Sequence, residues 1–220
     1  MTDVILCDDH ALIRRGIRDT LSDAPDIQVV GEAGDYGELR TLFRDRCGPG
    51  SGRVTPCDVL VLDINLPGRS GLDVLHALKD EGSPVKVLVV SMYPEDQYAI
   101  RALRAGAFGY VNKGGDPQLL VQAVRTVSQG RKYVTPEIAQ MLVESLTAPS
   151  SDQPHMTLSD REMQTLVMIA SGKRLADIAG DLTLSPKTVS VYRARVLEKL
   201  GLANNAELTV YAIRNGLVGQ

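Results

Sequence analysis

Five short apolar runs, each followed by a stretch with helical spacing, dominate the pattern of the first 111 residues. The runs cover residues 4–7, 27–30, 59–62, 85–90 and 108–111. Strands that are apolar without alternation are covered on both faces, which is typical of a parallel sheet between helices. The right-handed crossover rule then predicts an α/β fold with a doubly wound sheet of five parallel strands.

The rest of the chain predicts a second compact unit, because 220 residues exceed the usual size of one domain. The segment TAPSSDQP at 147–154 has the composition of an exposed linker. We expect one domain over 1–128, a linker over 129–155 with a helix at about 135–146, and a small all-α domain over 156–220. Caps and breakers divide that last domain into four helices near 159–171, 175–182, 186–200 and 204–215.

The composition excludes several classes of protein. No apolar run approaches the ~18 to 20 residues that a bilayer-spanning helix needs, and MTDVILCDDH turns acidic where a secretion signal would stay apolar. We therefore expect a cytoplasmic protein with no membrane partner. The three cysteines lack the spacing of a zinc site or a disulfide framework, so reduced thiols are expected.

Polar side chains follow four of the predicted strands directly. Asp8 and Asp9 follow the first strand, Asp63 the third, Ser91 the fourth and Lys113 the fifth. Ligands in such sheets bind beyond the carboxyl ends of the strands, so these side chains should share one rim. Three carboxylates repel one another unless a cation offsets the charge, and Mg²⁺ prefers oxygen ligands. The set predicts a magnesium site in which Asp63 could act as a nucleophile toward phosphorus.

These motifs, in this order, resemble the receiver domain of two-component response regulators, a flavodoxin-like fold. The resemblance rests on the pair Asp8-Asp9, the run DINLPGRSG from Asp63, Ser91, and the run YVNK that ends at Lys113. It implies that a sensor histidine kinase phosphorylates Asp63. It also implies that Mg²⁺ is bound by Asp9, Asp63 and the Asn65 backbone carbonyl, with Asp8 acting through water.

The same resemblance assigns the switch. Ser91 would be the switch hydroxyl, Lys113 the cation that contacts the phosphoryl group, and Tyr110 the aromatic switch on the fifth strand. An aromatic at a strand end is also commonly a core residue, so that alternative stays open for Tyr110. His10 could be a metal ligand, but a capping or solvated role is the expectation.

The helix at 186–200 carries the signal for nucleic acid. Its inner face has Val189, Tyr192, Val196 and Leu200 at helical spacing. We expect the other face to contact DNA, with Val191 and Ala194 suited to thymine methyl groups and the polar residues to phosphates. The predicted contact set is Lys187, Thr188, Ser190, Val191, Arg193, Ala194, Arg195 and Lys199. A basic helix face that is simply solvated remains the alternative.

Residues 158–218 resemble the LuxR-type helix-turn-helix of NarL/FixJ response regulators, through LSDREMQTLVMIASGKRLADIAGDL, LSPKTVSVYRARVLEKLGL and AELTVYAIRNGLV. The resemblance implies promoter DNA and RNA polymerase as partners, and a homodimer paired through Leu208, Tyr211 and Ala212. Core packing competes with that role for Leu208. Ser190, Tyr192 and the run RLAD at 174–177 depart from common family residues, which leaves the target sequence open.

Two other functions fit parts of the pattern. An aspartate-dependent phosphohydrolase could share the fold, but its nucleophile typically follows the first strand, whereas Asp63 follows the third. A scaffold that binds partners without phosphorylation would leave the full acidic set unexplained. We expect a phosphoacceptor with at most slow autodephosphorylation, not an enzyme.

Overall fold

The computed structural model describes residues 1–47, 54–93, 95–147 and 154–218. The chain forms two compact units, Met1–Thr147 and Ala148–Gln220. Residues 48–53, and residues 148–153 of the predicted linker, lie outside the described residues. Within the described ranges, no helix combines the length and the apolar character needed to cross a membrane.

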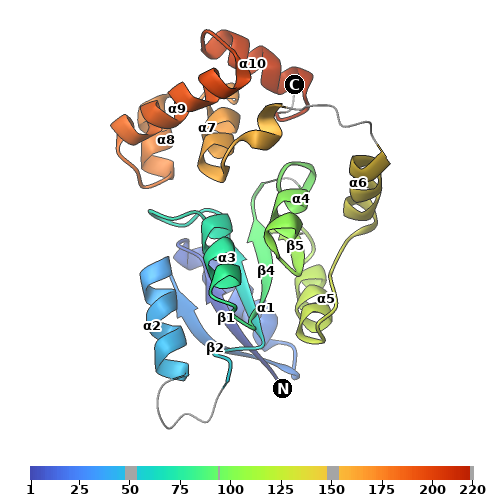
Figure 1. Cartoon of the computed structure of the whole chain (residues 1–220). Coiled ribbons are helices and arrows are strands. Elements are labelled where there is room, and N and C mark those ends of the chain that lie inside the picture. The colour runs from blue at the N-terminus through green and yellow to red at the C-terminus, as the bar shows by residue number, and fades with distance from the viewer. Residues whose placement is uncertain (48–53, 94, 148–153, 219–220) are drawn as a thin grey trace. The chain divides into compact units, whose positions relative to one another are not determined.

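The first unit contains the predicted sheet of five parallel strands, in the order β2-β1-β3-β4-β5 (Figure 1). Every residue of β3 is buried, as expected of a central strand. The order reverses beside β1, and the crevice at the carboxyl end of such a reversal is the usual ligand position. The strands are β1 Thr2–Cys7, β2 Ile27–Ala33, β3 Val59–Asp63, β4 Lys86–Ser91 and β5 Gly109–Asn112.

Five helices connect or follow these strands: α1 Ala11–Ser22, α2 Tyr36–Arg46, α3 Gly71–Asp80, α4 Glu95–Ala105 and α5 Pro117–Ser128. Helices α1 and α5 pack against each other and bury Leu21 and Val124 against β1 and β3. Right-handed crossovers place α2, α3 and α4 on the opposite face of the sheet (Figure 1). Both faces are therefore covered, which explains the unbroken apolar runs.

The first unit extends beyond the predicted boundary at 128. The backbone N–H of Tyr133 donates to the Phe108 carbonyl at 2.8 Å, and Tyr133 bridges Gly109 at the edge of β5. Helix α6, Pro136–Thr147, contacts α4 and buries Ile138 completely. Thr135 Oγ1 accepts a hydrogen bond from Ile138 N at 3.3 Å, as the side chain of an N-cap residue does. The segment predicted as linker therefore contains a helix that belongs to the core of this unit.

The second unit is all-helical, with η1 Pro154–Thr157, α7 Asp160–Ala170, α8 Leu175–Asp181, α9 Pro186–Leu200 and α10 Asn205–Arg214. A capping box of Ser159 and Glu162 begins α7, and Ser185 caps α9. Helix α9 ends at Gly201, whose φ of 65° is the left-handed value expected after a helix. The short helix η1 was not predicted, because Pro154–Thr157 has the composition of a linker.

Candidate functional site

One lysine joins two carboxylates at the carboxyl edge of the sheet. Lys113 Nζ lies 2.6 Å from Asp8 Oδ2 and 2.7 Å from Asp63 Oδ2. The exposed fractions of the Lys113, Asp8 and Asp63 side chains are 4%, 3% and 2%. Strands β1, β3 and β5 deliver these residues to one point because their carboxyl ends share an edge. The predicted grouping is confirmed for these three residues.

A glycine allows α3 to begin against this pocket. A Cβ at Gly71 would lie 1.9 Å from the Asp63 carbonyl oxygen, so only glycine fits. The Gly71 N–H donates to the Ile64 carbonyl at 2.8 Å, and Ser70 forms a capping box with Asp73. These contacts set the course of the chain immediately after the Asp63 side chain.

The electrostatics of the pocket favour an added cation. Burial raises the pKa of Asp63 to about 6, with a further increase from the charge of Asp8, while Lys113 acts in the opposite direction. A backbone hydrogen bond from Asn65 also favours the ionised form of Asp63. One lysine therefore offsets only part of the negative charge, and a divalent ion would offset the remainder.

The donor set fits a divalent ion. Ligand atoms from Asp8, Asp9, His10 and Asp63 all lie within 4.8 Å of one another. Asp9 Oδ1 is buried and, within the described part of the chain, makes no contact with hydrogen-bond geometry, although His10 Nδ1 lies 2.6 Å away. An unsatisfied buried carboxylate oxygen is costly unless it binds a cation. Asp8 Oδ2 also lacks hydrogen-bond geometry, but the Lys113 ammonium at 2.6 Å compensates its charge.

The backbone of Tyr93, between β4 and α4, accepts or donates three hydrogen bonds near the pocket. Ser91 Oγ accepts from Tyr93 N at 3.2 Å, the Tyr110 hydroxyl donates to the Tyr93 carbonyl at 2.7 Å, and Asn112 Nδ2 donates to the same carbonyl at 3.1 Å. Ser91 and Tyr110 are fully buried. We call Ser91, Tyr110 and Asn112 the Tyr93 clamp. Asn112 was missed by the sequence argument, although it directly precedes Lys113.

Helix α9 presents most, but not all, of its predicted DNA contacts to solvent. Lys187, Ser190, Val191, Ala194 and Arg195 are exposed. Three others engage neighbouring residues: Thr188 Oγ1 lies 2.7 Å from Ser185 Oγ, Arg193 Nε donates to Asn205 Oδ1 at 2.5 Å, and Lys199 Nζ donates to Glu162 Oε2 at 2.7 Å. These intramolecular contacts must be retained or exchanged when α9 meets DNA.

The Glu162 carboxylate explains the position of Lys199. Its side chain is 3% exposed and also accepts from Ser159 N at 2.7 Å in the capping box. Burial opposes ionisation of Glu162, but the hydrogen bonds from Lys199 and Ser159 outweigh it and lower its pKa. Lys199 therefore stabilises the start of α7, and it also lies next to the exposed face of α9.

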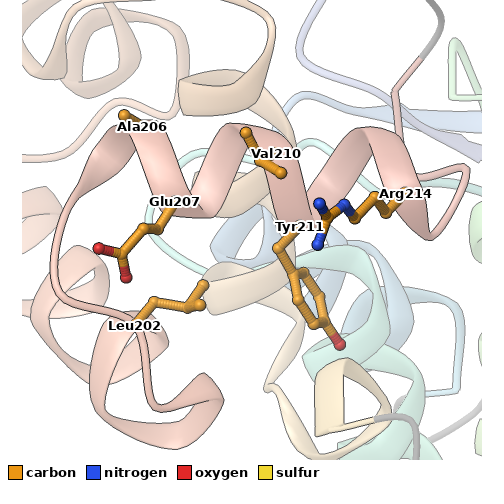
Figure 2. Close-up of a pocket in the computed structure, with 6 residues that line it drawn as sticks. All are labelled: Leu202, Ala206, Glu207, Val210, Tyr211 and Arg214. Atoms are coloured by element: carbon orange, nitrogen blue, oxygen red, sulfur yellow. The ribbon is translucent and has the colours of Figure 1, made fainter.

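The dimerisation prediction for α10 requires a correction. Leu208 and Ala212 are 0% exposed and form part of the helical core, so they have no surface to offer a second copy. The outer face of α10 instead carries a groove of about 360 Å³ (Figure 2). Tyr211 is half-buried there, with its hydroxyl 2.9 Å from His155 Nδ1. The groove is lined by Leu202, Ala206, Glu207, Val210, Tyr211 and Arg214.

Family models match both units of the chain. Residues 4–125 match the response regulator receiver domain, and residues 156–212 match the luxR family of bacterial regulatory proteins. The first match covers the acidic pocket and the second covers α9. The chain therefore belongs to the two-component response regulators with a receiver domain and a LuxR-type DNA-binding domain, which are transcription regulators.

Within that family, the chain is similar over its whole length to two regulators. It is 40% identical to the response regulator GacA of Pseudomonas protegens over 218 residues, which are 99% of this chain and 98% of the relative. It is 38% identical to the response regulator UvrY of Escherichia coli, with 99% and 96% covered. The solved structure of RcsB from Salmonella enterica bound to promoter rprA matches with a TM-score of 0.61 and 26% identity, covering 96% of this chain and 97% of that one.

Proposed function

We propose that this regulator is switched by phosphorylation of Asp63 and then binds promoter DNA as a homodimer. The observation that carries the proposal is the Lys113 ammonium, placed within 2.7 Å of both Asp8 and Asp63 in a buried pocket. A cation fixed beside a carboxylate nucleophile can hold the oxygens of an incoming phosphoryl group. The proposed donor is the phosphohistidine of a sensor histidine kinase.

The transfer uses this chain's own residues in defined roles. An Asp63 carboxylate oxygen forms the bond to phosphorus while the P–N bond of the phosphohistidine breaks, and the released imidazole takes up a proton. Lys113 contacts one phosphoryl oxygen and Ser91 donates to another. Asp9 and Asp63, with the Asn65 backbone carbonyl and with Asp8 through water, would hold Mg²⁺. Mg²⁺ supplies charge neutralisation and an oxygen-binding position when bound.

Phosphorylation would act through the Tyr93 clamp. The new group adds a charge of about −1.5 to −2 and acceptor oxygens. Ser91 Oγ now accepts from Tyr93 N at 3.2 Å, and turning toward the phosphoryl group would remove that acceptor. The segment between β4 and α4 would then repack, with Tyr110 as the buried aromatic switch. This change would raise the fraction of molecules in the conformation whose fourth and fifth β/α units form a dimerising surface.

The second unit is proposed to read DNA through α9 in a major groove. Val191 and Ala194 are exposed apolar residues that suit thymine methyl groups, and Lys187 and Arg195 suit phosphates. Thr188, Ser190, Arg193 and Lys199 are proposed as further contacts. The promoter complexes of RcsB formed with the phosphomimetic BeF₃⁻ support this role. Two copies would read two half-sites related by two-fold symmetry.

Dimer formation on DNA is proposed to use the outer face of α10. Val210 is 46% exposed and borders the groove with Ala206 and Tyr211. Residues 156–220 hold eight Lys and Arg against six Asp and Glu, so a single domain should bind the phosphates of DNA only modestly. Pairing two domains would raise the affinity for DNA through effective concentration. RNA polymerase is the proposed partner at the promoter, in the cytoplasm.

Acetyl phosphate with Mg²⁺ tests the phosphorylation. The wild-type chain should gain one phosphoryl group by intact mass, and Asp63→Asn should gain none. Labelling of Asp63→Asn at the wild-type level would refute Asp63 as the acceptor. A wild-type chain that stays unlabelled would favour a scaffold, and rapid turnover of a phosphoester substrate would favour a phosphohydrolase over the proposed non-enzymatic switch.

Selection of genomic DNA fragments tests the second half of the proposal. Phosphorylated wild-type protein should enrich sites with paired half-sites, whereas Asp63→Asn treated in the same way should enrich them weakly. Equal enrichment by both proteins would show that DNA binding does not depend on phosphorylation of Asp63, against the proposal.

A further inference from the structure

The backbone carbonyl of Asp8 lies between two elements of regular structure. Strand β1 ends at Cys7 and α1 begins at Ala11, so this carbonyl needs a partner from another part of the chain. Arg14, on the first turn of α1, supplies that partner, because its Nη1 donates to the Asp8 carbonyl oxygen. The Asp8 N–H donates to the Ala33 carbonyl of β2 at 3.0 Å. Both backbone polar groups of Asp8 are therefore held.

Glu32 on β2 holds the Arg14 guanidinium in place. Its Oε2 accepts from Arg14 Nε at 3.1 Å, so one planar group contacts a carboxylate and a backbone carbonyl at once. The other carboxylate oxygen, Oε1, accepts from Arg18 Nη1 at 2.9 Å. The exposed fraction of the side chain is 20% for Arg14 and 41% for Arg18. Arg14 is thus the more enclosed of the two arginines, and it is the one that contacts the pocket.

The contact from Arg14 orients one of the two peptide groups that flank Asp9. A peptide group is planar, so holding the Asp8 carbonyl oxygen also orients the N–H and Cα of Asp9. The peptide group on the other side is held as well, because the His10 N–H donates to Asp8 Oδ1 at 2.8 Å. The backbone of Asp9 is therefore set on both sides, and the adjustable part of this residue is its side chain.

We propose that Arg14 is a positioning residue of the phosphorylation site, which directs the Asp9 carboxylate into the pocket beside Asp63. The inference rests on the proposed function and adds to it a residue outside the acidic set. Asp9 contributes a donor atom to the group within 4.8 Å. Loss of an outer residue that orients a metal ligand typically lowers metal affinity about 10- to 100-fold. Loss of Arg14 should therefore weaken Mg²⁺ binding, although Arg14 bonds to the pocket through a backbone carbonyl.

The affinity test compares Arg14→Ala with a matched control, Arg18→Ala. Both substitutions remove an arginine of α1 that is paired with the Glu32 carboxylate, but only the first removes the donor to the Asp8 carbonyl. Isothermal titration calorimetry of the full, unphosphorylated chain measures Mg²⁺ affinity. Arg14→Ala should bind Mg²⁺ about tenfold more weakly than wild type, and Arg18→Ala should stay within about twofold. Equal affinities of the two variants would overturn the proposal.

Hydrogen exchange of the metal-free chain distinguishes positioning from a general loss of stability. In a chelator, Arg14→Ala should accelerate exchange about fivefold or more in a fragment that spans residues 8–10. Exchange in β4 should match wild type, and Arg18→Ala should leave residues 8–10 unchanged. Uniform acceleration across the sheet in Arg14→Ala would overturn the proposal, because Arg14 would then only join α1 to β2.

Arg14→Lys tests whether positive charge alone is sufficient, and it also serves if Arg14→Ala does not fold. A compact ammonium lacks the planar fork that contacts Glu32 and the Asp8 carbonyl together. Arg14→Lys should therefore bind Mg²⁺ about threefold or more weakly than wild type. Wild-type affinity in Arg14→Lys would overturn the geometric role of the guanidinium.

Labelling by acetyl phosphate at increasing Mg²⁺ separates this inference from the proposed function. Because Asp63 and Lys113 are unchanged, saturating Mg²⁺ should bring the labelling rate of Arg14→Ala to within about twofold of wild type. A rate that stays low at saturating Mg²⁺ would overturn the proposed route through Asp9. A wild-type chain that stays unlabelled, while Arg14→Ala still binds Mg²⁺ more weakly, would refute the proposed phosphorylation and support the role of Arg14 at the ion.

Discussion

Gly71 and Asp63 are in backbone contact, and a methyl group at Gly71 would come within 1.9 Å of the Asp63 carbonyl oxygen. Further atoms of the Asp63 and Ile64 backbone would lie within 2.9 Å of it, and backbone atoms of a central strand cannot move independently. The pocket and the start of α3 are therefore built as one unit. This contact gives the first prediction.

Gly71→Ala should destabilise the chain by about 1 to 3 kcal/mol or more, because the side chain overpacks a rigid backbone. It should also displace Asp63 and reduce labelling by acetyl phosphate. Urea denaturation and intact mass measure the two effects. Gly16→Ala in α1 is the control, since nothing lies within 4 Å of its added Cβ. It should leave labelling unchanged and stabilise α1 by up to roughly 1 kcal/mol.

Asp63→Asn should stabilise the metal-free protein at pH 7.5. The pKa of Asp63 is raised in the folded state from 3.8 to about 6, so the native state binds more protons than the unfolded state between these values. Its contribution to stability is therefore lost as pH rises through this window. The gain from the substitution should reach about 1 to 3 kcal/mol at pH 7.5 and vanish near pH 3.5.

Thermal or urea unfolding in a chelator, at both pH values, checks this difference. Asp80→Asn, an exposed position on α3, is the control and should change stability little at either pH. Added Mg²⁺ should stabilise wild type more than Asp63→Asn. A variant less stable than wild type at pH 7.5 would show that Lys113 fully compensates the buried charge.

Asn112→Ala should loosen the segment between β4 and α4. It removes one of two side-chain donors to the Tyr93 carbonyl, at a cost of about 0.5 to 1.5 kcal/mol. Hydrogen exchange should accelerate around Tyr93 more than in β1. Tyr110→Phe removes the other donor with little loss of volume and should give the same local pattern. Uniform acceleration across the sheet would indicate general destabilisation instead.

Lys187→Ala should chiefly affect DNA binding, whereas Lys199→Ala should chiefly affect stability. Lys187 is exposed at the start of α9, so its loss should weaken binding to all DNA sequences nearly equally and reduce the salt slope by about one. Lys199 is paired with the buried Glu162, so Lys199→Ala should chiefly destabilise the second unit. DNA titrations at several salt concentrations, beside unfolding curves, check both. Equal stability losses would contradict the assigned roles.

Thr183→Gly should stabilise the turn between α8 and α9. Thr183 has a φ of 53°, and a β-branched residue in the left-handed region carries strain of roughly 1 to 2 kcal/mol. Glycine relieves that strain but adds entropy to the unfolded chain, so the expected net gain is about 0.5 to 1 kcal/mol. Unfolding curves measure it, and Thr209→Gly, within helix α10, should be destabilising.

The sheet and the pocket were predictable because both follow from local patterns. Unbroken apolar runs identify buried parallel strands, and the residue after each strand then falls on the common rim, as for Asp63 and Lys113. Helix caps were equally local, as Ser159 and Ser185 show. In each case a few adjacent residues determine the position of the side chain.

The misses involve contacts between distant segments. The pairing of Tyr133 with the edge of β5, and the ion pair of Lys199 with Glu162, have no signal in their own neighbourhoods. Leu208 and Ala212 were assigned to a dimer surface from a resemblance, but helical spacing alone cannot tell a buried stripe from a binding stripe. His10 was expected to cap α1 or to be solvated; its side chain makes no capping hydrogen bond, is 57% exposed and lies 2.6 Å from Asp9 Oδ1.

Helix α10 has two different faces, with Leu208 and Ala212 buried in the core and Val210 and Arg214 on the outside. Substitutions on the outer face should therefore leave the folded core intact. If two copies pair through this face as proposed, duplicated genes for such regulators could change their pairing preference one residue at a time. Each intermediate protein would still fold, and its product would not pair with the products of the other copies.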